Sequence, residues 1–305
     1  MKTTLTVRNP LEPVKQLVLD AVPSRLTKTM YSIALDEFFA WWAKLEPRPA
    51  FNRAAVQAYR AALDERGLSA ATVNQKLSAI RKLAQEASYN GLLDATLAQG
   101  IREVRGAKMQ GTRTGNWLTK AKAERLINAP DASTLKGRRD RAILMLMIGG
   151  GLRRSEVAAL TMGHIQERDG RWCIVDLVGK HGRVRTVPMP PWAKTAIDEW
   201  TTAATISGGP VFRGVNKGDH ITGASLSSQG VARCVAEYSA RLKLDISAHD
   251  LRRTHAKLAY KGGAKLDQIQ LALGHASLVT TERYLGTHQN LTDAPADYLH
   301  LDLSA

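Results

Sequence analysis

A basic, glycine-rich stretch divides the chain at residues 105–116, "RGAKMQGTRTGN", and it shows no apolar periodicity. Glycine together with the lack of a buried face favours an exposed linker over a helix or a strand. The chain has 305 residues, which is enough for an ordinary domain on either side of such a linker. We therefore predict one domain before residue 105 and a second after residue 116.

The first domain, residues 24–104, has the apolar spacing of helices and no strand pattern. Apolar side chains recur at three- and four-residue steps from Ile33 to Trp42, and Ser24 and Asn52 are suitable helix caps. Residues 1–23 are expected to be an N-terminal extension that precedes the first helix. Four helices are predicted, near residues 25–45, 52–67, 69–91 and 95–104.

The second domain, residues 117–289, mixes helical and strand patterns. Residues 164–189 indicate a small antiparallel meander of three strands, with hairpin turns at Asp169-Gly170 and between Gly179 and Gly182. The predicted fold class is therefore mainly α with a small antiparallel β-sheet (α+β). Helices are expected near residues 119–129, 135–149, 191–205, 225–243, 248–262, 265–273 and 277–286, with another beginning at Arg153–Arg154.

The charge of the chain indicates a polyanionic partner. There are 43 Lys and Arg against 28 Asp and Glu, a net charge of +15, and the pI is near 10.0. Nucleic acid is the commonest partner of such a chain. A membrane surface is the competing partner, but we find no lipidation motif, signal peptide or spanning apolar run. Cys173 and Cys234 lack metal-ligand spacing, so we expect buried thiols in a cytoplasmic protein.

Two stretches place basic residues at turns. "GGGLRRSEVAAL" (149–160) places Arg153 after a glycine-rich turn at a helix N-terminus, an arrangement that suits phosphate binding. Helix capping explains the serine and glutamate that follow equally well. "VGKHGRVRTVP" (178–188) lifts Lys180 on a hairpin turn, where solubility is the usual role of lysine. In the linker, Arg105, Lys108 and Arg113 would suit a segment along a phosphate backbone, and a merely solvated linker fits its composition equally well.

Two further stretches contain groups for proton transfer and nucleophilic attack. "SAHDLRRTHAKLAY" (247–260) puts His249 and Arg252 three residues apart and so on one helix face. A histidine at a helix start is more often a cap or a surface group, but beside an arginine on the same face it is a credible acid–base group near a bound phosphate. "LGHASLVTTERY" (273–284) contains His275 and ends on Tyr284. Taken alone, that tyrosine would be an aromatic side chain packed against a core.

The four stretches together, in this order, resemble the tyrosine recombinase (phage integrase) family in the two-domain form of the Xer recombinases. The resemblance covers residues 108–289 and makes the helical segment similar to that family's core-binding (SAM-like) domain. It implies a site-specific recombinase or integrase that cleaves and rejoins DNA through a 3′-phosphotyrosine intermediate. Strands would be exchanged between two short target sites.

The resemblance also implies a role for each matching position. Tyr284 would be the nucleophile, Arg153 and Arg252 would clamp the non-bridging phosphate oxygens, and Lys180 would be the general acid for the departing 5′-oxygen. The proton of the tyrosine and further phosphate contacts would belong to His249 and His275.

Three more side chains complete this set. Glu156 would hold the pocket in shape. Arg253 stands where members of the family often have histidine, which makes it a candidate for phosphate contact, and Arg154 is another. No carboxylate cluster suited to a metal and no GxxxxGK[ST] loop accompanies these residues, so neither a metal nor another cofactor is expected.

The chemistry is coherent without metal. A phenol with a pKa of about 10 needs a base and a cationic pocket to act as a nucleophile near neutral pH. Guanidinium groups stabilise the negative charge that develops on the phosphate oxygens. Two alternatives stay open. One is a type IB topoisomerase, which relaxes DNA with the same chemistry, and the other is a catalytically silent DNA-binding regulator of the same fold.

The C-terminal tail, residues 290–305, has no lysine or arginine but contains three aspartates and several apolar side chains. It could fold back on its own domain. The resemblance implies instead that it docks on a neighbouring protomer, within a tetramer that holds two DNA sites with short inverted core sequences. Accessory DNA-bending proteins are further candidate partners.

Overall fold

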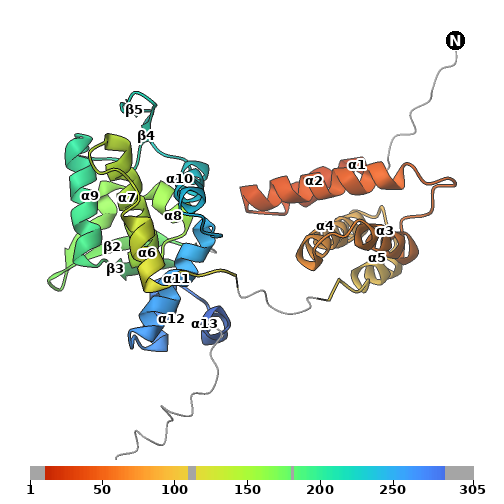
Figure 1. Ribbon diagram of the computed structural model, residues 1–305. Helices are drawn as coiled ribbons and strands as arrows, with labels where there is room; N and C mark the ends of the chain where they lie inside the picture. Colours follow the sequence, from red (N-terminus) through yellow and green to blue (C-terminus); the bar gives the residue numbers. More distant parts are fainter. Residues whose placement is uncertain (1–10, 109–114, 180–181, 286–305) are drawn as a thin grey trace, which may run out of the picture. The chain divides into compact units, whose positions relative to one another are not determined.

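The structure, a computed structural model, describes residues 11–108, 115–179 and 182–285 (Figure 1). The chain divides into two compact units, Met1–Thr112 and Arg113–Ala305. This division falls within the stretch that the sequence indicates as a linker.

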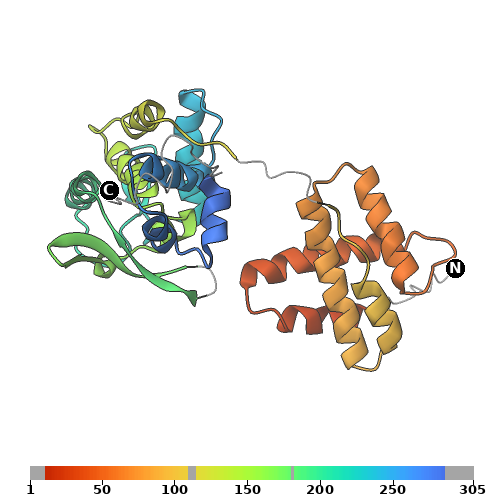
Figure 2. The same ribbon diagram turned by 90° about the horizontal axis from the view of Figure 1, so that it is seen from below.

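The described part of the first unit is helical. Ser24, Asn52 and Ser69 cap their helices, since each side chain accepts a hydrogen bond from the backbone N–H three residues later. In the middle of the unit α4 contacts each of the other helices (Figure 2). The helices are α1 (Glu12–Asp20), α2 (Arg25–Trp42), α3 (Arg53–Glu65), α4 (Ala70–Tyr89) and α5 (Ala95–Arg102).

Helix α1 corrects the prediction that residues 1–23 only precede the first helix. Val14 and Val18, one helical turn apart, are fully buried and pack against the core of the unit. The helix has nine residues and prolines lie on both sides of it, so its apolar stripe is too short to be distinguished by periodicity.

The second unit is built around α7 (Leu135–Gly149), which contacts helices on several sides and is buried from Ala142 to Ile148. Its remaining helices are α6 (Lys120–Ile127), α8 (Arg154–Ala159), α9 (Pro191–Ala203), α10 (Ser228–Arg241), α11 (Ala248–Lys261), α12 (Leu266–Leu273) and α13 (Leu278–Leu285), with a 3-10 turn η1 (Met162–His164).

The predicted meander is present as β1 (Ile165–Arg168), β2 (Arg171–Val178) and β3 (Val184–Pro188), all antiparallel. Asp169 and Gly170 both have positive φ at the first turn, as a two-residue hairpin requires. A second small sheet, β4 (Gly214–Val215) with β5 (Ile221–Thr222), has no counterpart in the prediction, because two-residue strands leave no periodic pattern. The prediction of a mainly helical fold with a small antiparallel sheet is confirmed.

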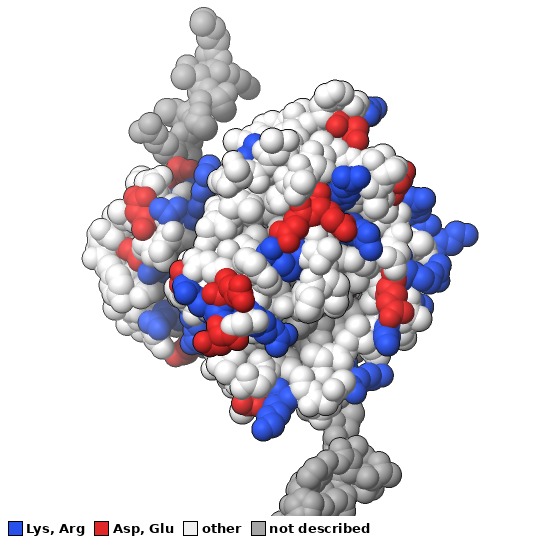
Figure 3. All heavy atoms as spheres, turned by 90° about the vertical axis from the view of Figure 1, so that its left-hand side faces the viewer, with Lys and Arg blue, Asp and Glu red and all other residues white. Residues whose placement is uncertain are grey.

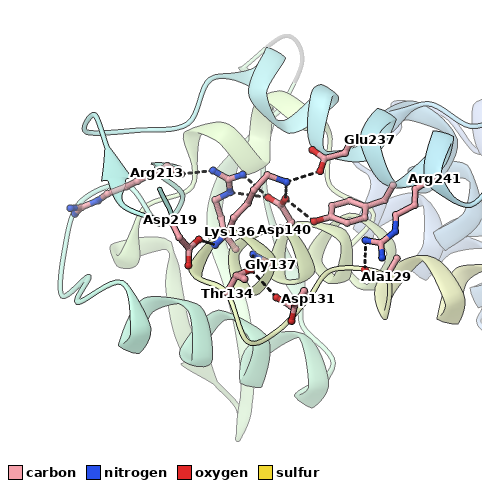
Figure 4. A network of polar contacts seen from close by, with 12 residues as sticks. Ala129, Asp131, Thr134, Lys136, Gly137, Asp140, Arg213, Asp219, Glu237 and Arg241 are labelled. Atoms are coloured by element: carbon pink, nitrogen blue, oxygen red, sulfur yellow. Dashed lines mark hydrogen bonds and ion pairs between the residues drawn. The ribbon is translucent and has the colours of Figure 1, made fainter. Parts of the chain in front are cut away.

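A buried polar network joins α7 to α10 and the β4–β5 hairpin (Figure 4). Asp140 is fully buried and accepts hydrogen bonds from Arg139, Lys136 and the hydroxyl of Tyr238. Asp219, from the hairpin, accepts the backbone N–H of Lys136 at 2.8 Å. These hydrogen bonds hold α10 and the hairpin against α7, the helix that leads into the glycine turn described below.

Cys173 and Cys234 are buried free thiols, as predicted. No helix among the described residues is long and apolar enough to span a membrane.

Candidate active site

A glycine turn between α7 and α8 shapes one wall of the site. Gly151 has a φ of +60°, and a Cβ at this position would lie 2.7 Å from a ring carbon of His255. Only glycine accepts both the left-handed backbone and this close approach. The turn delivers Arg153 to the N-cap position, directly before α8, where its backbone N–H and its Nη1 both donate to Glu156 at 2.7 Å.

Glu156 forms ion pairs with two arginines, Arg153 and Arg185. It is 4% exposed, and Arg185 donates from Nη1 to Oε1 and from Nη2 to Oε2, both at 2.9 Å. Burial by itself would raise the pKa of Glu156, but the hydrogen bonds and charges of Arg185 and Arg153 hold it below the ordinary value. The bidentate pair fixes β3 against α8 and orients Arg153.

Arg252, on α11, is only 1% exposed. Its Nη1 donates to the carbonyl of Gly151 at 2.6 Å, and its Nη2 donates to the carbonyl of Leu273. Burial and then the charge of Arg153 lower its pKa to about 10, so the guanidinium stays charged at neutral pH. Neither of these hydrogen-bond partners is a carboxylate, and a buried cation held by carbonyls alone suits a site that receives an anion.

The hydroxyl of Tyr284, on α13, lies 2.5 Å from Nε2 of His249. Helix α11 is capped by Ser247, whose N–H and hydroxyl both donate to Asp250, so the histidine is not used as a cap. The two rings meet edge to face with centroids 5.5 Å apart. Residues 35 positions apart in the sequence thus form a candidate nucleophile–base pair.

His275 lies on another side of the same tyrosine, with ring centroids 5.1 Å apart. Its Nδ1 is 2.9 Å from the hydroxyl of Thr281, which holds the ring against α13. Burial, and next the charges of Arg252 and Arg153, lower the pKa of His275 to about 4. The imidazole is therefore neutral at pH 7 in the free protein.

The ionisation of the pair follows from the same surroundings. Burial raises the pKa of Tyr284, and the charges of Arg252, Arg253 and Arg153 oppose that rise. Burial lowers the pKa of His249, and Arg253 and Arg252 lower it further. A neutral imidazole next to a protonated phenol is the state in which a general base is ready to act.

Of the remaining predicted residues, Arg154 and Arg253 lie at the site, and the others lie in the first unit or outside the described residues. Arg154 is exposed and lines, with Arg153, His249 and Arg252, a cavity of about 490 Å³. Arg253 is half-buried and is described below with Tyr284. Arg105 and Lys108 are exposed residues of the first unit, while Arg113 and Lys180 lie outside the described residues.

Two contributing residues were missed in the sequence. Arg185 shares a strand face with buried Val187, and this two-residue spacing was the available signal for an inward-pointing arginine. His255 lies one turn after Arg252 on α11, and its Nδ1 is 2.8 Å from the carbonyl of Ile148. Burial lowers its pKa, which leaves a neutral ring that fixes the glycine turn.

The positive charge of the unit is not spread evenly over it. On the face that α9 covers, Figure 3 shows basic and acidic side chains interspersed among uncharged ones. At the candidate site, by contrast, Arg153 and Arg185 pair with one buried carboxylate, Glu156, and the buried Arg252 adds a further positive charge without a carboxylate hydrogen-bond partner. No group of three or more His, Cys, Asp or Glu that could hold a metal occurs in the described part of the chain.

Comparisons with known proteins identify the family of the chain. The profile of the phage integrase family matches residues 116–290, and that of the phage integrase N-terminal SAM-like domain matches residues 14–91. Tyrosine recombinase XerC of Xylella fastidiosa (strain 9a5c) is 30% identical over 237 residues, which are 77% of this chain and 76% of that protein. Tyrosine recombinase XerD of Vibrio cholerae is 29% identical over 266 residues, 85% of this chain and 84% of that protein.

Solved structures share the fold. The post-cleavage complex of XerH with a palindromic difH substrate aligns with a TM-score of 0.69 and 22% identity, covering 92% of this chain and 81% of that one. A lambda integrase dimer bound to a COC′ core site aligns with a TM-score of 0.69 and 17% identity, covering 92% and 78%. The resemblance seen in the motifs is confirmed, and the chain belongs to the phage integrase family as a tyrosine recombinase.

Proposed function

We propose that Tyr284 is the nucleophile with which this tyrosine recombinase cleaves and rejoins DNA at specific sites. One observation carries the proposal: the Tyr284 hydroxyl lies 2.5 Å from Nε2 of His249, beside a buried arginine that has no carboxylate partner among its hydrogen bonds. A phenol needs a base within hydrogen-bond reach and positive charge at the place where phosphate oxygens will lie. This site supplies both.

In the proposed cleavage step, Oη of Tyr284 attacks the scissile phosphorus while its proton passes to His249. The P–O bond to the 5′-oxygen breaks, which leaves a 3′-phosphotyrosine and a 5′-hydroxyl. We assign the proton of the departing oxygen to Lys180 on the evidence of its motif. Arg153 and Arg252 stabilise the negative charge on the non-bridging oxygens, and His275 donates a further hydrogen bond to the phosphate.

Rejoining reverses these steps with a 5′-hydroxyl from the partner site as the attacking group. The covalent bond conserves the phosphodiester energy, so the proposed cycle needs neither nucleotide nor metal. Glu156 acts by orienting Arg153, and Arg154, Arg105, Lys108 and Arg113 are proposed phosphate contacts. The helical domain, with α1 included in its core, and the linker of residues 105–116 are proposed to bind DNA as well as the catalytic domain of residues 117–289.

The metal-free mechanism is tested with a duplex that is nicked close to the cleavage site. Cleavage releases the short fragment that carries the new 5′-hydroxyl, so rejoining is prevented and the covalent adduct accumulates. We expect adduct in EDTA at the rate seen with magnesium, and a loss of at least about 100-fold in Arg252→Lys, since a point charge cannot replace the bidentate fork. Arg138→Gln is the matched control, because Arg138 lies near the N-terminal end of α7, whereas the glycine turn of the site follows its C-terminal end. Cleavage that stops in EDTA would contradict the mechanism.

Strand exchange is separated from the two alternatives with a supercoiled plasmid that carries two target sites. A recombinase gives products with exchanged flanks, a topoisomerase gives relaxed circles only, and a silent regulator gives no adduct at all. We propose that exchange occurs in a tetramer on two sites with short inverted core sequences, in the cytoplasm, with the tail of residues 290–305 as the protomer contact. Accessory DNA-bending proteins are candidate helpers.

A further inference from the structure

Arg253 lies between the ring of Tyr284 and the end of the interdomain linker. Its guanidinium carbon is 4.9 Å from the centre of the Tyr284 ring, which is a cation–π contact. Its Nη1 donates to Asp250 at 3.2 Å, and the side chain is only 12% exposed. The carboxylate thereby holds the guanidinium on the ring, because Asp250 is itself fixed as the cap partner of Ser247.

The interdomain linker ends on the same guanidinium. A Cβ at Gly115 would lie 1.5 Å from Nη1 and 2.6 Å from Cζ of Arg253, and the φ of Gly115 is +32°. The linker backbone therefore lies directly against the arginine, and any side chain at this position would displace one of the two.

The end of the linker is also hydrogen-bonded to α11, the helix that carries the arginine, and to the loop that precedes it. Asn116 donates from Nδ2 to the backbone carbonyl of Asp245 at 2.6 Å and to its carboxylate at 2.8 Å. The backbone N–H of Leu118 donates to the hydroxyl of Thr254 at 2.9 Å. These bonds on both sides of Trp117 keep the end of the linker against α11.

Other charged groups surround the tyrosine, and Arg253 differs from them in its placement. It is the member that contacts both the ring and the linker, and its charge opposes the rise that burial causes in the pKa of Tyr284. The charged and titratable groups around Tyr284 include His249, Asp250, Arg252 and Arg253 on α11, Arg153 just before α8, and His275 between α12 and α13. Lys257 on α11 also lies against α13, where it donates to the carbonyl of Leu285.

We propose that Arg253 is a positioning residue for Tyr284 and that the linker at Gly115 sets the position of its guanidinium. The position of the nucleophile then depends on the position of the linker. The inference rests on the proposed function of Tyr284. It differs from the simpler expectation that Arg253 binds a DNA phosphate, since a residue held by Asp250 and covered by Gly115 acts on the tyrosine and its base. A linker moved by DNA binding would shift the guanidinium, and the tyrosine ring would follow.

The first experiment measures the single-turnover rate of adduct formation at saturating protein against pH, for wild type, Arg253→Gln, Arg253→Met and Arg253→Lys. Loss of the positive charge raises the pKa of both His249 and Tyr284, so the limbs of the profile move to higher pH in the Gln and Met variants. The saturated rate at pH 7 should fall about tenfold or more. Lysine restores the limbs, because it keeps the charge, and recovers the rate only in part.

Equilibrium DNA binding in the same variants distinguishes positioning from phosphate contact. We expect affinity within about threefold of wild type and an unchanged dependence on salt. A salt slope reduced by about one, with an unchanged saturated rate and pH profile, would overturn the proposal, since that is the signature of a lost phosphate contact. Arg138→Gln controls for the loss of one positive charge from the unit.

The linker is tested with a double-mutant cycle between Gly115→Ala and Arg253→Gln. We expect Gly115→Ala to slow the saturated rate in the wild-type background and to have little further effect when Arg253 is already Gln. Multiplicative effects of the two changes would show that the linker does not act through the arginine. Thermal melts of both single variants confirm that each is folded before its rate is compared.

A Tyr284→Phe control in the same assay keeps the two claims apart. Adduct that persists in this variant overturns the proposed function itself. Adduct that is lost there, while the Arg253 variants behave as wild type, overturns only the positioning role.

Discussion

At the scale of single residues, the site combines positively charged arginines with neutral imidazoles, which suits it to bind a negatively charged phosphate. His275 has a pKa of about 4, because burial and then Arg252 and Arg153 disfavour its protonated form. The unfolded chain would hold this proton up to about pH 6.5. The free protein therefore loses stability as the pH falls from about 6.5 towards 4, since the unfolded state binds more protons in that window.

DNA should partly reverse this effect. A phosphate placed among the arginines brings the negative charge that the imidazole lacks, so the pKa of His275 rises on binding and protons are taken up between about pH 4 and pH 6.5. The uptake is measured by calorimetry in buffers of different ionisation enthalpy. We expect it to shrink in His275→Gln and to persist in His220→Gln, a histidine of the β4–β5 hairpin. Equal uptake in wild type and His275→Gln would contradict this account.

The same residues show what sequence can predict about a site. Arg153, His249, Arg252, His275 and Tyr284 were predicted from motif order, and the structure brings their side chains together. Arg185 was not predicted, although it lies in one of the four stretches, because its importance comes from a carboxylate 29 positions away. A pairing of this kind depends on how β3 packs against α8, and no local pattern encodes it.

At the scale of elements, the glycine turn after α7 connects the packing of the core with the site. The carbonyl of Gly151 accepts from Arg252, and its missing side chain leaves room for His255. Gly151→Ala puts a Cβ 2.7 Å from the imidazole on a left-handed backbone. Strain and displacement of this kind cost about 1–3 kcal/mol.

We expect Gly151→Ala to lower the melting temperature and to reduce adduct formation about tenfold or more, because the carbonyl that holds Arg252 moves with the turn. Gly170→Ala, which has a similar φ but open space around it, is the matched control. It should show a comparable backbone penalty and an unchanged rate of cleavage. If the two variants cleave equally fast, the turn does not position the arginine.

The elements that sequence predicted are those with a cap and several turns of periodicity. The helices that begin after Ser24, Asn52 and Ser69 have both signals. Helix α1 and the β4–β5 hairpin have neither, since one is a short stripe between prolines and the other pairs strands of two residues each. Their positions are decided by contacts with distant parts of the chain.

At the scale of the whole molecule, we propose that recombination uses several protomers and that the tail is the contact between them. Residues 290–305 lie outside the described residues, so the argument rests on their composition. Apolar side chains without any lysine or arginine suit a protein surface better than DNA. A head-to-tail contact of this kind would close into a ring and couple neighbouring active sites.

Removal of residues 291–305 should leave binding to a single site unchanged while cooperative assembly on two sites and recombination fall about tenfold or more. Gel shifts with one-site and two-site DNA measure the first two quantities, and a two-site plasmid measures the third. The full-length Tyr284→Phe protein, which is expected to assemble without cleaving, is the control for assembly. Normal synapsis and normal recombination by the truncated protein would remove this role from the tail.

The most direct test of the account identifies the residue that becomes bonded to DNA. Protein is incubated in EDTA with the nicked duplex, and the adduct is digested and mapped by mass spectrometry. The account predicts a DNA 3′-phosphate on Tyr284, no adduct in Tyr284→Phe despite DNA affinity close to that of wild type, and normal adduct in Tyr260→Phe. An adduct that survives in Tyr284→Phe, or that maps to any other residue, would contradict it.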